Sequence, residues 1–195
     1  MTIGAAPLIN ETESLLRQEF RSLAVARTQF PMLTDWGIED FSETVHSLGM
    51  NYLASIGRTG GRLALSEYPV RVSAGLEGPR HVRPDAVWWD AASRHIELVG
   101  EFERYEGQEL QDKVRNLLLA HRALGEGPRV LLMMLWTLSG TQVQPTVEFQ
   151  SMIRSGFRTP GGIRIAGLEA DSRLVVATAI LVKSDGRLRL KEILL

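Results

Sequence analysis

The stretch RPDAVWWDAASRHIELVGEFER, residues 83–104, decides the fold class that we predict. Its segments 85–89 and 95–104 alternate or cluster apolar residues and indicate two strands, joined by the five small or polar residues 90–94. Two strands with so short a connection form a plausible β-hairpin. An amphipathic segment (109–124) follows, and then a predicted strand (129–136) that is fully apolar after Arg129. A hairpin, a helix crossover and a further strand together predict an α/β protein whose mixed sheet is covered by helices.

Acidic residues gather on the second of these predicted strands. Side chains alternate between the two faces of a strand, so Glu97, Val99, Glu101 and Glu103 are expected on one face. Glu101 and Glu103 would then hold two negative charges about 7 Å apart, which is unfavourable unless solvent or a cation compensates them. Asp85 begins the neighbouring strand and can reach the same point. Three converging carboxylates are ligands that Mg²⁺ or Mn²⁺ prefers, whereas Glu97 lies ~13 Å from Glu101 and is left out.

Pro84-Asp85, a gap of 15 residues and then Glu101-x-Glu103 on an apolar strand resembles the PD-(D/E)XK nuclease superfamily. The predicted order of elements over about residues 34–137 is also similar to that family's common core. The resemblance implies a mixed central β-sheet flanked by helices, with a restriction-endonuclease-like core (α-β-β-β-α-β), to which a C-terminal β-hairpin is added here. It further implies that Asp85 and Glu101 bind the metal and that the chain hydrolyses phosphodiester bonds of nucleic acid, with DNA as the first expectation.

Glu103 falls where most members of this superfamily have the lysine that orients or activates water. Some restriction enzymes of the superfamily carry glutamate there, so glutamate in place of lysine at this position does not exclude catalytic activity. Lys113 is a candidate for a relocated lysine, since it lies at the edge of the apolar stripe of the predicted helix 109–124. Glu103 or Lys113 would then position or deprotonate the water. The alternative is a surface lysine whose stem covers the core.

Other interpretations of the acids stay open. They can form a solvated strand end whose charges pair with arginines, namely Arg83, Arg94, Arg104 or Arg115. A nuclease-like scaffold without catalysis, which binds nucleic acid or protein, is a second functional hypothesis. An accidental match in an unrelated α/β fold is a third. Glu43, on the first long predicted helix, is a weaker candidate ligand or else a solvated residue, and the four histidines show no metal-binding spacing.

Composition sets wider limits. The chain has 195 residues, 44% of them hydrophobic and 23% charged, which predicts one globular domain over 1–195. The formal net charge is -1, so a surface that binds nucleic acid must concentrate positive charge locally or through a metal. The absence of cysteine excludes disulfides and thiolate metal sites. Without a signal peptide or a run of ~18 apolar residues, we expect a cytoplasmic protein that does not span a membrane, and many members of the resembled family form homodimers.

The rest of the chain predicts the first helix and first strand of the core, and additions at both of its ends. We expect a short N-terminal helix from Asn10 or Thr12, a helix over 34–56, a strand over 62–72 that Pro69 makes irregular, and a helix over 145–156. Residues 174–183 and 187–194 predict a hairpin with Asp185-Gly186 in its turn. The C-terminal third is basic and predicts either a phosphate-contacting surface or ordinary solvated charge; its basic residues are Arg154, Arg158, Arg164, Lys183, Arg187, Arg189 and Lys191.

Overall fold

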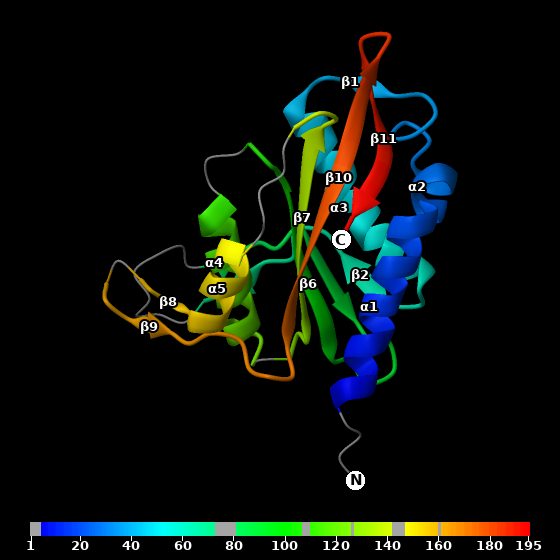
Figure 1. Ribbon diagram of the computed structural model, residues 1–195. Helices are drawn as coiled ribbons and strands as arrows, with labels where there is room; N and C mark the ends of the chain where they lie inside the picture. Colours follow the sequence, from blue (N-terminus) through cyan, green and yellow to red (C-terminus); the bar gives the residue numbers. More distant parts are fainter. Residues whose placement is uncertain (1–4, 73–80, 107–109, 126, 142–146, 160) are drawn as a thin grey trace.

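A seven-stranded mixed sheet organises the protein, as the computed structural model shows (Figure 1). The structure describes residues 5–72, 81–106, 110–125, 127–141, 147–159 and 161–195. The strands run in the order β1-β11-β10-β7-β6-β5-β2. Their bounds are Ile38–Glu39 (β1), Leu63–Leu65 (β2), Ala86–Trp89 (β5), Ile96–Arg104 (β6), Val130–Leu138 (β7), Arg173–Ser184 (β10) and Arg187–Leu194 (β11). The predicted α/β class with a mixed sheet is thus confirmed.

The centre of the sheet has the expected connectivity. Strands β2, β5 and β6 are antiparallel neighbours, and β6 continues through helix α4 (Leu110–Ala123) into β7, which is parallel to it. The apolar run 130–136 is buried throughout, because helices cover both faces of this part of the sheet. The antiparallel pairing of β5 with β6 confirms the hairpin predicted from residues 83–104.

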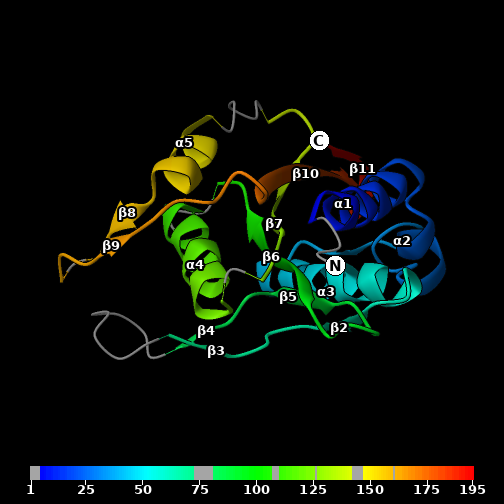
Figure 2. The ribbon, with the colours of Figure 1, turned by 90° about the horizontal axis from the view of Figure 1, so that it is seen from below.

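Helices cover the two faces of the sheet unequally (Figures 1 and 2). On one face lie α1 (Ala5–Ser22), α2 (Ala24–Gln29) and α3 (Ser42–Thr59), which pack with Trp88, Leu98 and Phe102. On the other lie α4 and α5 (Val147–Ser155), which pack with Val99 and Leu131. Successive side chains of these strands point to opposite faces of the sheet, so they pack into two separate hydrophobic cores. None of the described helices has the length and apolar character that a membrane span requires.

The predicted helix over 34–56 was placed too early. Helix α3 begins only at Ser42, and Ile38–Glu39 forms strand β1 against Leu188 and Arg187 of β11. The cause lies at Gly37, which has a φ of +72°. A β-carbon on Gly37 would lie 2.9 Å from Arg187 Cβ, so the bare backbone lets the chain turn close to β11.

The predicted strand over 62–72 is divided in two. Residues 63–65 form β2 at the edge of the sheet, whereas Val70–Arg71 forms β3, which pairs with β4 (His81–Val82) in a separate ribbon. Glu67, with a φ of +52°, and Pro69 lie between them and turn the chain away from the sheet. The ribbon packs on the C-terminal half of α4 instead.

The C-terminal hairpin is confirmed, with Asp185 and Gly186 in its turn. Its first strand, β10, also pairs in parallel with β7 along nine residues, so the hairpin extends the central sheet. The connection from β7 to β10 passes through α5 and a small ribbon of β8 (Phe157–Arg158) and β9 (Arg164–Ile165). Because β6, β7 and β10 are parallel, their carboxyl ends meet at one edge of the sheet.

Candidate metal centre

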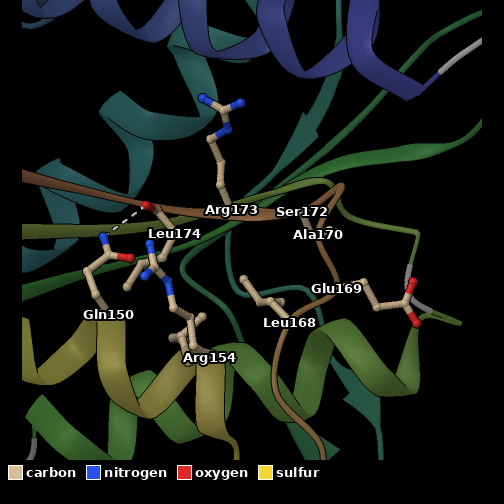
Figure 3. Close-up of a pocket in the computed structure, with 9 residues that line it drawn as sticks. Gln150, Arg154, Leu168, Glu169, Ala170, Ser172, Arg173 and Leu174 are labelled. Carbon is tan, nitrogen blue, oxygen red and sulfur yellow. Dashed lines mark hydrogen bonds between the residues drawn. The ribbon is translucent and has the colours of Figure 1, made fainter.

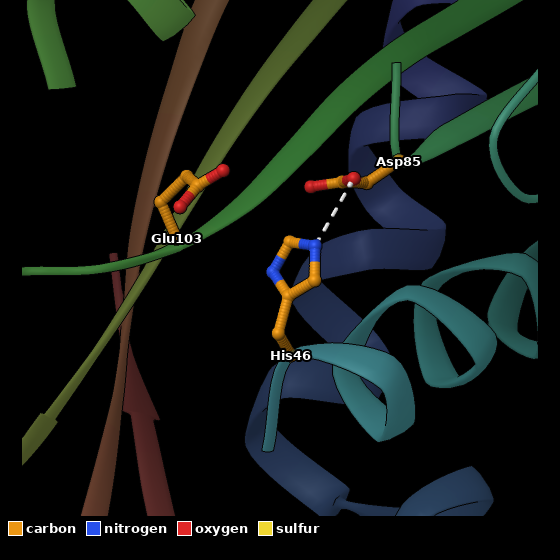
Figure 4. A group of neighbouring side chains, drawn as sticks. All are labelled: His46, Asp85 and Glu103. Atoms are coloured by element: carbon orange, nitrogen blue, oxygen red, sulfur yellow. Dashed lines mark ion pairs between the residues drawn. The ribbon is translucent and has the colours of Figure 1, made fainter. Parts of the chain in front are cut away.

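Three ligand-bearing side chains converge at this carboxyl edge (Figure 4). His46 comes from the second turn of α3, Asp85 immediately precedes β5, and Glu103 lies near the end of β6. Each offers one ligand atom, and the three atoms lie within 4.8 Å of one another. Asp85 is buried and the other two are partly buried. The site therefore sits where two strands and a helix meet.

The ring of His46 is oriented by the backbone of β6. Its Nδ1 lies 2.7 Å from the carbonyl oxygen of Phe102. A carbonyl only accepts hydrogen bonds, so Nδ1 carries the proton and donates it. A backbone carbonyl on one imidazole nitrogen is the arrangement that commonly fixes a metal-binding histidine, with the other nitrogen as ligand. In this arrangement Nε2 points to the site, 3.5 Å from Asp85 Oδ1.

Asp85 is held by the same backbone residue. Its Oδ2 accepts a hydrogen bond of 2.7 Å from the Phe102 N–H, and only 4% of the residue is exposed. Burial raises the pKa of Asp85, although the charge of His46 and the Phe102 N–H both lower it. The other oxygen, Oδ1, faces His46 Nε2. Two acceptor atoms face each other here unless a proton or a cation lies between them.

Close packing of α3 on β6 makes this geometry achievable. Gly49, one turn after His46, lies against the ring of Phe102, and a β-carbon at Gly49 would approach that ring to 2.1 Å. A larger residue must therefore displace either α3 or Phe102. Because Phe102 orients both His46 and Asp85, Gly49 contributes to the site without carrying a ligand atom.

We expect Gly49→Ala to lower the free energy of unfolding by about 1–3 kcal/mol through overpacking. It should also weaken Mn²⁺ binding about tenfold by displacing the backbone that orients the ligands. Chemical denaturation and calorimetric titration measure the two effects. Gly100→Ala is the matched control, since a β-carbon at this buried β6 glycine meets nothing closer than 3.4 Å. Equal Mn²⁺ affinity in the two variants would contradict the assignment.

Glu101 and Lys113 form the inner wall of the site. Glu101 is 1% exposed, and its Oε2 accepts no hydrogen bond, its nearest cation being Lys113 Nζ at 3.5 Å. The same Nζ forms an ion pair with Glu103 Oε1. Burial raises the pKa of Glu101 well above its usual range, and the charge of Asp85 adds to this, while Lys113 lowers it. Burial alone would lower the pKa of Lys113, but Glu101 and Glu103 outweigh it and raise this pKa.

Comparison with protein-family models, with curated proteins and with solved structures finds no match to this chain. The chemistry of the described side chains therefore carries the functional argument. Two carboxylates and an imidazole are suitable ligands for a divalent cation, and Glu101 beside them is a further buried carboxylate whose Oε2 accepts no hydrogen bond. Imidazole suits transition metals better than Mg²⁺, so of the two expected ions the donor set favours Mn²⁺.

The structure brings together most of the residues predicted from the sequence. Asp85 and Glu103 belong to the group of three ligands, whereas Glu101 lies outside it. Lys113 extends from α4 and contacts both Glu101 and Glu103, as its position on the predicted helix suggested. Glu43 is exposed on the first turn of α3, outside that group. His46 was missed, because ligands from separate elements leave no spacing pattern in the sequence.

Glu97 does not share a face with Glu101, contrary to expectation. The pairing of β5 with β6 shifts register, from Trp88 opposite Leu98 to Trp89 opposite Ile96, so Glu97 occupies a bulge. Its carboxylate turns toward α1, where it binds Thr12 Oγ1 at 3.1 Å and Arg62 Nε at 3.0 Å. Glu97 therefore belongs to the packing of α1.

The arginines that could have neutralised the acids are engaged elsewhere or exposed. Arg104 pairs with Glu106, and Arg115 pairs with Asp112. Arg83 and Arg94 are exposed, and among the described residues no ion pair joins either of them to the acids of the site. The one cation that contacts two of these acids is Lys113, within the part of the chain that the structure describes.

Proposed function

We propose that the chain is a divalent-metal-dependent nuclease that hydrolyses phosphodiester bonds of nucleic acid, with DNA as the first substrate to test. One observation carries the proposal: His46 Nε2 and Asp85 Oδ1 face each other at 3.5 Å with a Glu103 oxygen nearby, and a lysine stands beside them. A metal site next to a fixed cation is a combination suited to phosphoryl transfer.

The residues divide into ligands and a positioning cation. His46, Asp85 and Glu103 would hold Mn²⁺ or Mg²⁺, and Glu101 would add negative charge or a further ligand as in the resembled superfamily. A bound divalent ion supplies positive charge to a scissile phosphate and lowers the pKa of a water molecule. Lys113, which contacts Glu103 in the structure, carries donors that would orient that water or a phosphate oxygen if Glu103 served as a metal ligand.

The arrangement of elements supports a restriction-endonuclease-like core. Helix α3, strands β2, β5 and β6, helix α4 and strand β7 follow the order of that core, with the first three strands antiparallel and the last parallel. Lys113 on α4 lies against Glu103, which supports a lysine relocated from the strand to the helix. A cytoplasmic location and a homodimer are further parts of the proposal, the latter tested by sedimentation.

Cleavage of labelled single-stranded DNA, duplex DNA and RNA, with Mg²⁺, Mn²⁺ or EDTA, tests the function directly. We expect cleavage of at least one substrate with metal and none with EDTA. Glu103→Gln, which removes a ligand charge, should abolish it, and Glu43→Gln on the exposed face of α3 should not. Wild-type protein that cleaves none of the three substrates with either metal would refute a nuclease of this kind.

A scaffold without catalysis is the second candidate, and the ion pair of Lys113 with Glu103 favours it. That ion pair neutralises part of the negative charge of the site without a metal. In addition, the net charge of -1 gives the protein no general electrostatic attraction to nucleic acid. Calorimetric titration with Mn²⁺ separates the candidates. Binding that disappears in Glu103→Gln supports the metal site, whereas heat that is absent from the wild-type protein supports the scaffold.

A further inference from the structure

The ribbon of β8 and β9 carries two arginines directly opposite each other. Arg158 and Arg164 are paired across this ribbon, which projects beyond α4 and α5 (Figure 2). Both side chains are exposed. Like charges at directly opposed positions of an antiparallel pair destabilise it. The protein thus keeps an unfavourable pair in one of its smallest ribbons.

Among the residues that the structure describes, no carboxylate forms an ion pair with these two arginines. The sequence contains no aspartate or glutamate between Glu148 and Glu169, while Arg154, Arg158 and Arg164 all fall in that interval. Arg158 donates to the carbonyl oxygen of Gly162 at 3.0 Å and Arg164 to that of Ser155 at 3.3 Å. These acceptors hold the guanidinium groups in place without neutralising them. We call Arg154, Arg158 and Arg164 the arginine arm.

The arm is attached to the helix that carries Lys113. The guanidinium of Arg115, two residues after Lys113 on α4, lies 5.8 Å from the centre of the Phe157 ring at the start of β8. A groove of about 650 Å³ runs between α4 and α5 at this point, lined by Gln111, Arg115 and Phe157 among others. One helix therefore connects the candidate metal centre with the base of the arm.

A second cleft lies on the other side of α5, at the start of β10 (Figure 3). It has a volume of about 500 Å³, and Arg154 and Arg173 both line it. Arg173 pairs with Glu13 at 2.8 Å, whereas Arg154 forms no ion pair among the described residues, although Glu169 also lines the cleft. The uncompensated positive charge therefore continues from the ribbon onto α5 through Arg154.

From these contacts we infer that the arginine arm binds the phosphate backbone of nucleic acid and holds it against the α4 side of the protein, an inference that rests on the proposed function. Guanidinium groups fit phosphate oxygens through paired N–H donors. Three exposed guanidiniums, none of them in an ion pair among the described residues, supply the local positive charge that the chain as a whole, at -1, lacks. Such contacts contribute affinity without reading sequence.

The test measures binding of a fluorescein-labelled 20-base-pair DNA duplex in EDTA, where no metal-dependent cleavage occurs, over a range of KCl concentrations. The double variant Arg158→Gln/Arg164→Gln is expected to bind more weakly. Its slope of log K against log [KCl] should be shallower by about 1.8, or 0.9 for each lost phosphate contact. Arg21→Gln/Arg27→Gln is the matched control. It removes the same charge from exposed residues of α1 and α2 on the opposite face, and its slope should stay unchanged.

The arm variant should remain folded, since it relieves a repulsive pair, and an unchanged or higher Tm shows that weak binding is not caused by unfolding. Equal slopes for the two double variants would overturn the inference, as would a wild-type protein that binds polyglutamate but not the duplex. Cleavage is measured in a separate assay. If the wild-type protein cleaves nucleic acid but the two double variants have equal salt slopes, only the inference about the arginine arm is refuted. A wild-type protein that binds through the arm but does not cleave refutes only the nuclease.

Discussion

Asp85→Asn is expected to abolish metal-dependent cleavage, with a loss of about a thousandfold or more. Asparagine keeps a side-chain oxygen that can accept the 2.7 Å hydrogen bond from Phe102 N–H, so the local backbone can stay in place. It removes the negative charge that faces His46 and with it one ligand of the proposed metal site. Several kcal/mol of metal-derived stabilisation of the transition state are lost, and each 1.36 kcal/mol is a factor of about ten in rate.

Single-turnover cleavage at saturating Mn²⁺ measures the loss, and titration calorimetry shows whether Mn²⁺ still binds. Asp112→Asn is the matched control, because this exposed carboxylate lies on α4 next to Lys113 and pairs with Arg115 away from the site. We expect the control to keep its rate within a few-fold. A rate for Asp85→Asn that equals the control would remove Asp85 from the chemistry.

The elements predicted well from the sequence are those whose signal is local. The period-2 and period-3.6 patterns of residues 85–138 depend on each segment alone, and β5, β6, α4 and β7 appear where those patterns placed them. The Asp185-Gly186 turn is equally local. The partner of β10 was not predictable in this way, because its parallel pairing with β7 depends on the path of the intervening chain.

The candidate site shows the same division. The PD and ExE spacing identified Asp85, Glu101 and Glu103, and helical geometry identified Lys113, all from short segments. His46 could not be found, because its orientation depends on the carbonyl of Phe102, a residue far away in sequence. Glu97 was misplaced because a bulge depends on the register of two strands, which alternation within one strand does not reveal.

Lys113→Met in the metal-free protein is expected to lower the free energy of unfolding at neutral pH by about 3–5 kcal/mol, as when one partner of a buried ion pair is removed. Glu101 has 2% of its side chain exposed, and no other cation lies within ion-pair distance of it among the described residues. The substitution therefore leaves a buried carboxylate uncompensated next to Asp85. Urea denaturation of the wild type and the variant in EDTA measures the difference.

The pH dependence of this loss has a defined sign. Burial and Asp85 raise the pKa of Glu101 in the folded protein, so the folded state binds this proton more tightly than the unfolded state does. The stability associated with the protonated carboxyl is present at low pH and is lost as pH rises through the raised pKa. The deficit of Lys113→Met should therefore shrink on acidification, since a proton then replaces the missing lysine charge.

Two rescues distinguish charge from packing as the cause of the deficit. The double variant Lys113→Met/Glu101→Gln removes both charges and should recover most of the lost stability at neutral pH, because no unpaired ion remains buried. Saturating Mn²⁺ should also stabilise Lys113→Met, and by more than it stabilises the wild type, since there the metal must displace the ion pair of Lys113 with Glu103. A deficit that neither rescue reduces would mean that Lys113 acts through the packing of its stem, and the charge balance proposed for this site would be wrong.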